Sequence, residues 1–255
     1  MKRTLAGLLA FCCLSPVALA QEDKPTEKKD EPVRSEKAVE ILTKADEITK
    51  KVNSVRYKGT AQARGVVAQG QPDAEFEARI VGLENTPDYK FRIEVKYKGD
   101  DSAEEKTFTV GSDGDTFFLV DPAEKKVYED IDPAVIGLRG RQARGVVMRE
   151  YNHPAPFSDE INGRVVEYMG TEKVADEQCH KIRIEYATAA NQVATWYFST
   201  KDYLPRRCDR DFTFPQGTGS TQVILTMVEV DPKDDGNPFA SKVPDGYTKT
   251  DDFAP

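Results

Sequence analysis

Apolar and polar residues alternate almost without a break from Tyr89 to Tyr97. One side of this run carries Tyr89, Phe91, Ile93, Val95 and Tyr97, and every residue between them is charged. A period of two with one charged side is typical of an antiparallel strand that buries only its other face. Similar runs recur along the chain, so the pattern predicts a protein built mainly from an antiparallel β-sheet.

Turn residues separate successive runs, and no helix-sized insert lies between neighbouring strands until residue 130. This spacing favours a meander over parallel βαβ units. We expect roughly ten or eleven strands. They are predicted at Val55–Val67, Ala74–Leu83, Tyr89–Tyr97, Glu105–Val110, Thr116–Val120, Lys126–Glu129, Arg164–Val174, Cys179–Tyr186, Gln192–Ser199, Pro205–Phe214 and Thr221–Val230.

Two segments have helical character. Ser35 is the predicted cap of an amphipathic helix over Glu36–Val52, where apolar residues recur at steps of three and four. The second segment begins at Asp132-Pro133 and reaches Tyr151, but it contains three glycines. Each glycine costs about 1 kcal/mol relative to alanine inside a helix. The sequence therefore predicts a weak or broken helix, suited to a mobile cover over the sheet.

These helices are too few to cover the apolar face. Eleven strands at ~4.8 Å each make a flat sheet about 50 Å wide, whereas one helix, ~10 Å across, shields about two strands. The sheet must therefore curl, recruit a partner or hold an apolar ligand. Candidate ligand-binding residues on the apolar face are Phe91, Ile93, Val95, Phe117, Leu119, Ile182, Ile184, Trp196, Phe198, Leu225 and Met227. An ordinary packed core is the alternative for each of them.

The N-terminus has the three parts of a secretory signal peptide. Charged residues precede an apolar stretch over Leu5–Val17, and Ala18-Leu19-Ala20 is a cleavage signature. Residues 21–34 mix both charges with two prolines and are predicted to form a disordered leader. Residues 35–255 are then predicted to form a single domain. We expect a periplasmic or secreted protein without a transmembrane segment, because no other stretch approaches ~20 apolar residues.

Charge excludes one class of partner. The whole chain has a net charge of -8, and removal of residues 1–20 takes away two basic residues and no acid, which leaves -10. Such an acidic chain is a poor binder of nucleic acid. Within it, Arg139, Arg141, Arg144 and Arg149 form a basic patch. The patch suits contact with a phosphate headgroup or an acidic partner, or it is simply a solvated helix face.

Catalytic chemistry has little support in the sequence. His153 and His180 are the only histidines, and no metalloprotease, serine hydrolase or phosphate-loop motif is present. Cys179 adjoins His180, but neighbouring residues of a strand point to opposite faces and would not meet. We expect no catalytic residue, no metal and no cofactor. Cys179 and Cys208 remain after processing, either as a disulfide or as two buried thiols. Their predicted strands flank a third, which argues against easy pairing.

The chain from about Ser35 to its end resembles the LolA/LolB-like periplasmic lipoprotein carriers, and Val174–Arg210 is similar to their second half. The resemblance rests on Val174-Ala-Asp-Glu-Gln-Cys-His-Lys-Ile-Arg-Ile-Glu-Tyr, on Ala194-Thr-Trp-Tyr-Phe-Ser and on Lys201-Asp-Tyr-Leu-Pro-Arg-Arg. The closing Val243-Pro-Asp-Gly-Tyr is also similar to the end of that family. The chain differs from the family in its single tryptophan, its charged leader and its glycine-interrupted cover.

The resemblance implies an α+β fold, mainly antiparallel β, in which a curved half-barrel sheet carries a helical lid over an apolar cavity. Members of the family bind lipids or the acyl chains of lipoproteins, and some act as envelope sensors. The resulting hypothesis is an exported, non-catalytic protein that holds a lipid, an acyl chain or another apolar ligand. The alternative is an envelope sensor or interaction protein whose apolar sheet face docks another envelope protein.

Overall fold

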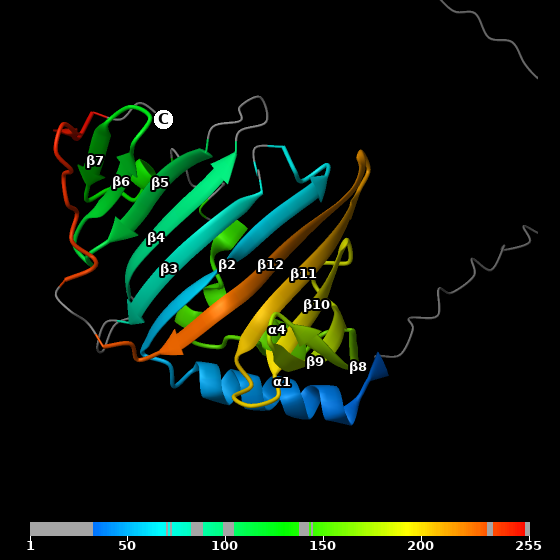
Figure 1. Ribbon diagram of the computed structural model, residues 1–255. Helices are drawn as coiled ribbons and strands as arrows, with labels where there is room; N and C mark the ends of the chain where they lie inside the picture. Colours follow the sequence, from blue (N-terminus) through cyan, green and yellow to red (C-terminus); the bar gives the residue numbers. More distant parts are fainter. Residues whose placement is uncertain are drawn as a thin grey trace, which may run out of the picture. The chain divides into compact units, whose positions relative to one another are not determined.

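The structure is a computed structural model that describes residues 33–69, 71, 73–82, 89–98, 105–137, 143, 145–233 and 237–252. The predicted signal peptide and almost all of the predicted leader lie outside the described residues. The part that is described forms one curved, open sheet of thirteen strands, a half-barrel with few helices (Figure 1). The predicted fold class is confirmed.

The strands follow the alternating runs of the sequence closely. In spatial order the sheet is β1-β8-β9-β10-β11-β12-β2-β3-β4-β5-β6-β7-β13. The strand bounds are β1 (Val33–Arg34), β2 (Ser54–Gly65), β3 (Ala74–Gly82), β4 (Tyr89–Lys98), β5 (Glu105–Ser112), β6 (Phe117–Asp121), β7 (Lys126–Asp130), β8 (Val165–Val174), β9 (Glu177–Glu185), β10 (Gln192–Ser199), β11 (Pro205–Phe214), β12 (Gly217–Val230) and β13 (Thr248–Thr250).

The sequence analysis expected roughly ten or eleven strands, and it missed the two strands at the edges of the sheet. β1 pairs with β8 and β13 pairs with β7, both in parallel, whereas the other pairs are antiparallel. Two or three residues are too few to show an alternation, so such strands leave no signal in the sequence. They form because these two short segments run beside β8 and β7, whose backbone N–H and C=O groups on one side would otherwise lack partners in the sheet.

Helix α1 (Glu36–Thr49) is the main helix of the described chain. The Ser35 side chain caps it by accepting a hydrogen bond from the Ala38 backbone N–H. The helix ends three residues before the predicted Val52, and it buries Ala38, Ile41, Leu42 and Ala45 in the main core. The predicted second helix is broken, as its glycines indicated: the described residues contain α2 (Ala134–Gly137) and the 3₁₀ turn η1 (Arg149–Asn152). The short helix α4 (Ser158–Ile161) follows.

The sheet has an apolar inner face and a charged outer face. On β2 to β4 the inner face carries Tyr57, Phe76 and Ile93, which belong to the main core, whereas Lys58, Glu77 and Glu94 occupy the outer face. The helices and turns between β7 and β8 lie behind the strands in Figure 1, on the inner face. The apolar alternation of the sequence therefore faces α1 and this segment, while the charged positions remain in solvent.

A β-bulge on β12 corrects one residue of the predicted apolar face. The register between β12 and β2 shifts between Leu225 and Met227. Leu225 is 1% exposed in the core, but Met227 lies opposite Lys58, on the outer face. Val228 takes its place opposite Tyr57 and packs against the core. An extra residue in one strand moves each later side chain of that strand to the opposite face of the sheet. The alternation of the sequence does not reveal such a residue.

Candidate functional site

The inner face contains a cavity of about 540 Å³ between β3, β4 and β5 and the segment that follows β7. Its floor is Ile80, Tyr89, Phe91, Ile93 and Val110. Ile80 is paired with Phe91 and Ile93 with Val110, so neighbouring strands present one continuous apolar surface. A volume of this size lies within the ~300–1,000 Å³ range of small-molecule pockets.

We use the name cavity cover for α2, Ala143, residues 145–148 and η1. From the cover and its two ends, Pro133, Ile136, Gly137, Ala143, Val147, Arg149, Asn152 and His153 line the cavity. The lining is apolar on the sheet side, and its polar groups come from the residues at the end of the cover. Such a cavity can hold an apolar chain that carries one polar end.

Tyr57 holds the cover against the sheet. Its hydroxyl oxygen accepts a hydrogen bond of 3.2 Å from the Met148 backbone N–H, and its ring stacks on Tyr151 at 5.6 Å between centroids. Both contacts are buried. They fix the cover at its junction with η1, whereas α2 is joined to the sheet through Val135 and Ile136 in the main core.

A buried charged cluster lies beside this junction. Glu150 of η1 forms an ion pair of 3.5 Å with Arg210 of β11, and their side chains are 11% and 27% exposed. Arg210 lies 5.1 Å from the centre of the Trp196 ring. Burial raises the pKa of Glu150, and Arg210 offsets only part of that rise. Arg210 therefore provides the cation that lets η1 carry a carboxylate on the inner face.

Glu160 of α4 is a second buried acid in this cluster. The Tyr186 hydroxyl donates a 2.7 Å hydrogen bond to its Oε1. Burial raises the pKa of Glu160, and the bond from Tyr186 counteracts part of the effect. Arg210 thus acts on both buried acids at the base of the cover, and Arg149 also acts on Glu150.

The structure places most of the predicted ligand-binding residues in one core, but only two of them at the cavity. Phe91 and Ile93 line it. Phe117 packs partly buried against the same core, and Met227 lies on the other face, as described above. The remaining predicted residues are buried core residues: Val95, Leu119, Ile182, Ile184, Trp196, Phe198 and Leu225.

Sequence reasoning missed several lining residues. Ile80, Val110 and Tyr89 lie on the apolar sides of predicted strands. The alternation within each strand could therefore have placed them on the same face of the sheet as Phe91 and Ile93. Ile136, Val147 and His153 come from the irregular segment after β7, where no period indicates a face. Of the predicted basic patch, Arg149 is exposed and lines the cavity, and Arg139, Arg141 and Arg144 lie outside the described residues.

The two cysteines are free and buried, so the structure does not contain the disulfide that the sequence left open. Cys179 packs with Val174 and Tyr197, whereas Cys208 belongs to the main core on the inner face. They lie on β9 and β11 with β10 between them. Two thiols on different strands and opposite faces are outside the Cβ separation of about 4 Å that a disulfide requires.

The buried thiols lead to a direct prediction. Burial raises the pKa of Cys179 to about 11 and also raises that of Cys208. We expect neither thiol to react quickly with Ellman's reagent in the folded mature chain, and both to react after denaturation. The mass of the chain should be the same with and without reductant. A bond between the two cysteines that reductant cleaves would contradict this arrangement.

Cys179 and His180 do not form a catalytic pair. The His180 ring lies between Tyr168 and Tyr203, at 5.9 and 5.8 Å between centroids, whereas Cys179 belongs to the cluster on the other face. Burial lowers the pKa of His180, and Lys37 and Lys44 of α1 lower it further. This histidine is therefore a neutral member of an aromatic group that packs against α1.

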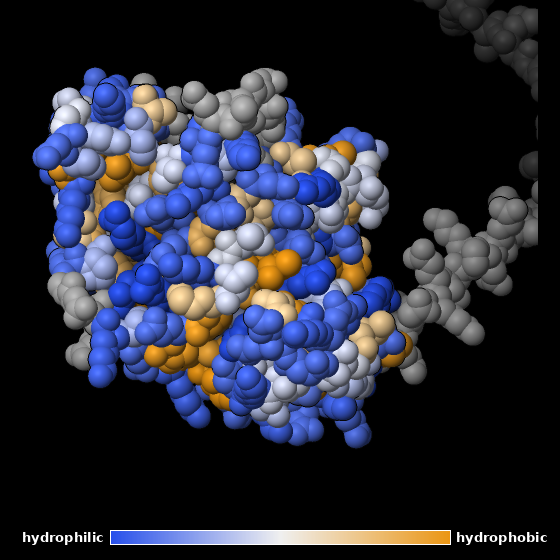
Figure 2. All heavy atoms as spheres, viewed as in Figure 1, coloured by the Kyte–Doolittle hydropathy of each residue, from blue (hydrophilic) through white to orange (hydrophobic). Residues whose placement is uncertain are grey.

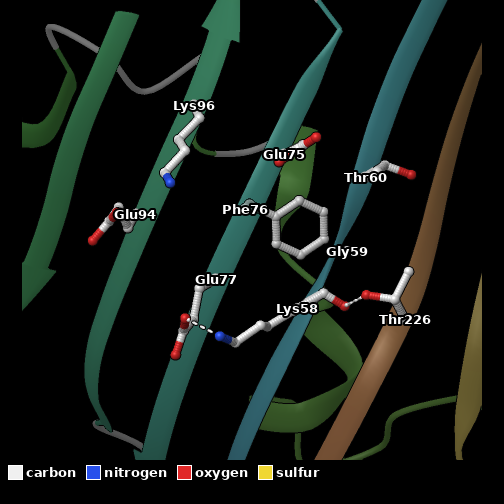
Figure 3. A pocket seen from close by; sticks show the side chains of 9 residues that line it. All are labelled: Lys58, Gly59, Thr60, Glu75, Phe76, Glu77, Glu94, Lys96 and Thr226. Atoms are coloured by element: carbon white, nitrogen blue, oxygen red, sulfur yellow. Dashed lines mark hydrogen bonds and ion pairs between the residues drawn. The ribbon is translucent and has the colours of Figure 1, made fainter.

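The outer face has hollows of a different character. One, of about 400 Å³, is surrounded by side chains of β2, β3, β4 and β12 (Figure 3). Lys58 reaches Glu77 at 2.8 Å, and the Thr226 hydroxyl donates to the Lys58 carbonyl at 3.4 Å. Figure 2 shows the same face as mainly hydrophilic, with small hydrophobic areas. These polar hollows do not suit an apolar ligand.

No helix among the described residues is long and apolar enough to cross a membrane. No protein-family model matches the sequence, and a search of curated proteins found no match.

Solved structures do match the fold. LprF from Mycobacterium bovis has a TM-score of 0.47 and 14% identity, over 82% of this chain and 100% of that one. The lipoprotein LppX from Mycobacterium tuberculosis has a TM-score of 0.47 and 14% identity, over 78% and 97%. The Pseudomonas aeruginosa MucA/MucB complex matches with a TM-score of 0.45 and 10% identity, over 81% of this chain and 61% of that chain.

Proposed function

We propose that this protein is an exported, non-catalytic carrier that binds one acyl chain in the cavity between β3–β5 and the cavity cover. The observation that supports this most is the cavity itself: about 540 Å³, with a floor of five apolar or aromatic side chains and one arginine among the described residues that line it. A lipid or the acyl chain of a lipoprotein has the matching chemistry, an apolar chain with an acidic or polar end.

Burial of the chain supplies the binding energy. Each methylene removed from water contributes about 0.8 kcal/mol, so about ten methylenes contribute about 8 kcal/mol before the costs of association. Arg149 makes no hydrogen bond or ion pair with the described residues through its side chain, and it is exposed at the cavity. It is therefore placed to contact a carboxylate or phosphate at the end of the chain.

A change that fills the cavity tests this proposal. Gly137 lines the cavity, and a Cβ added there would meet no described atom within 4 Å, so a larger side chain can begin at this position without a close contact. We expect Gly137→Leu to weaken palmitate binding at least tenfold, because the new side chain brings four carbon atoms into the cavity and the loss of even two buried methylenes costs about 1.6 kcal/mol. The measurement is displacement of a fluorescent fatty acid, titrated with palmitate.

Gly145→Leu is the matched control. Gly145 belongs to the same cover, its nearest neighbour to an added Cβ is 4.0 Å away, and it does not line this cavity. Both changes replace a helical glycine with a better helix former, so only the filling of the cavity distinguishes them. Equal palmitate affinity in the two variants would reject the proposed site.

The same titration tests the role of Arg149. Arg149→Gln should weaken binding of palmitate but leave binding of the uncharged hexadecanol unchanged. If the unaltered protein takes up neither compound and instead associates with itself or with envelope proteins as its concentration rises, the docking alternative replaces the carrier proposal.

A further inference from the structure

Three turns of the sheet carry no charge. Residues 65–72, 186–200 and 212–228 contain no Asp, Glu, Lys or Arg, although 31% of the chain is charged. Each of these stretches includes the turn of one hairpin, β2–β3, β9–β10 or β11–β12. The sequence alone shows three separate neutral stretches and no reason to connect them.

The strand order brings these turns together. The strands β9, β10, β11, β12, β2 and β3 are consecutive in the sheet, and each pairs antiparallel with the next. The three turns therefore leave the sheet at the same end, where the tip of β2 lies beside the β11–β12 hairpin in Figure 1. The turns at the other end are charged: Asp176 lies between β8 and β9, and Lys201 and Asp202 lie between β10 and β11.

Hydrogen bonds join the three turns into one surface. The Val66 backbone N–H donates to the Thr218 carbonyl at 3.0 Å, and the Thr213 N–H donates to the Asn191 carbonyl at 2.9 Å. Val66 also packs beside Gly217, where an added Cβ would lie 3.0 Å from Cγ1 of Val66. We use the name uncharged rim for the described residues of these turns, 66–69, 71, 186–191 and 212–218. Contacts within the protein set the shape of this rim, so it is formed before any partner binds.

The rim carries apolar side chains that the core does not use. Phe212 and Phe214 are half-buried, and their rings stack at 6.0 Å between centroids. Neither ring belongs to the hydrophobic core of the described residues or packs against it. Val66, on the neighbouring turn, is 38% exposed. Apolar side chains that lie outside the core and partly in water indicate a contact surface.

Acidic residues border the rim. Asp211 is exposed directly before it on β11, and Asp73 accepts a 2.8 Å hydrogen bond from Arg64 at the base of the β2–β3 turn. Residues 99–104, which join β4 to β5 and lie outside the described residues, include three acids and no base. The whole chain has a net charge of -8. An anionic surface would therefore be repelled, whereas a neutral one would not.

We propose that the uncharged rim docks on the surface of a zwitterionic lipid bilayer, with Phe214 and Val66 at the depth of the first acyl carbons. Aromatic side chains are favoured at the membrane interface, whereas each charged side chain opposes entry. The rim also exposes Thr213, Gln216 and Thr218, whose polar groups need headgroups or water as partners. The docking is therefore shallow. No residue of the rim lines the apolar cavity, so this proposal does not rest on the carrier function.

The form of the rim favours a bilayer over a protein partner. A stable protein interface buries about 800 Å² on each partner and requires complementary shapes. The rim consists of three turns side by side, with apolar side chains only at a few positions. A fluid bilayer adapts to such tips, and their backbone polar groups remain at the depth of the headgroups, where water is available.

Sedimentation with phosphatidylcholine vesicles tests the contact. We expect the purified protein to sediment with these vesicles and Phe214→Ser to lower its partition coefficient at least tenfold, because the variant no longer transfers a phenylalanine ring out of water. The variant should melt like the unaltered protein, since Phe214 lies outside the core. Failure of the unaltered protein to sediment, or equal sedimentation of the folded variant, would overturn the proposal.

Two glutamines provide a matched pair of charge changes. Gln216 is exposed at the tip of the β11–β12 hairpin, and Gln178 is exposed on β9 near the charged end of the sheet. Gln216→Glu should weaken vesicle binding at least about threefold, because the new charge must stay hydrated. Gln178→Glu should bind like the unaltered protein. Equal losses in both variants would assign the effect to net charge and reject the rim.

A tryptophan in the rim locates the contact. Trp196 is the only tryptophan of the chain and is fully buried. In Phe214→Trp, phosphatidylcholine vesicles should shift the emission to shorter wavelength, and brominated lipid should quench it. The unaltered protein should show neither change. Emission of Phe214→Trp that vesicles leave unchanged would place any lipid contact elsewhere and reject the proposal.

Other occupants of the rim would give different results. Concentration-dependent association without vesicles, abolished in Phe214→Ser, would show that the rim joins two copies of the chain and would reject the bilayer. Stronger binding to phosphatidylglycerol than to phosphatidylcholine would also reject it. Gly137→Leu, which fills the cavity, should sediment with vesicles like the unaltered protein. Failure of the carrier proposal can therefore be distinguished from failure of the rim.

Discussion

Replacement of Arg210 with alanine is expected to lower the free energy of unfolding by about 3 kcal/mol, because it leaves buried acids without a cation. Arg210 pairs with Glu150 at 3.5 Å, and its charge also reaches the buried Glu160. The change also removes the contact of the guanidinium with the Trp196 ring. Urea unfolding at neutral pH measures the loss.

The loss should depend on pH in a defined direction. Burial already raises the pKa values of Glu150 and Glu160 above those of the unfolded chain, and removal of Arg210 raises that of Glu150 further. The folded variant therefore binds more protons than the unfolded chain at pH values just above the ordinary glutamate pKa. Its deficit in stability should shrink as pH falls towards that value and grow as pH rises.

An exposed arginine of the outer face is the control. Arg64 of β2 donates to Asp73 at 2.8 Å, their side chains are 57% and 52% exposed, and Arg64→Ala should cost at most about 1 kcal/mol. The double variant Arg210→Met with Glu150→Leu removes both charges and should recover most of the stability. If Arg210→Ala and Arg64→Ala prove equally mild, the buried cluster does not stabilise the cover.

Gly59→Ala is expected to lower the free energy of unfolding by about 2–3 kcal/mol. A Cβ at this position would lie 2.1 Å from the Ile224 backbone oxygen and 2.9 Å from Cζ of Phe76. The oxygen belongs to the β12 backbone just before the bulge, so relief requires the β2–β12 pairing to move. Thermal or urea unfolding of the purified variant measures the effect.

Gly82→Ala is the matched control for this prediction. Gly82 ends β3, and an added Cβ would meet only the Asn53 oxygen at 3.8 Å, an ordinary contact. This change should leave stability unchanged or raise it slightly, because alanine restricts the unfolded chain more than glycine does. Equal effects of the two substitutions would show that the close approach at Gly59 does not constrain the sheet.

The helices and strands of this protein could be predicted from local sequence patterns. Alternation located the eleven longer strands within a few residues, and the spacing of apolar residues located α1 with its cap at Ser35. The three glycines after Asp132 indicated the broken segment that became α2, Ala143 and η1. These features are local, because strand period, helix period and backbone freedom depend on residues that are neighbours in the chain.

Contacts between residues far apart in the chain could not be predicted in the same way. Seven of the predicted cavity residues are plain core, because the cavity lies where the irregular cover leaves space, and an irregular segment has no period to read. The bulge after Leu225 moved Met227 to the outer face, and it is the strand order that places the three uncharged turns side by side. Register and coverage are set by contacts between residues far apart in sequence, and a shift of one residue reverses a side chain's face. For that reason, a sequence pattern indicates which side chains share one face of a strand, but not which residues those side chains contact.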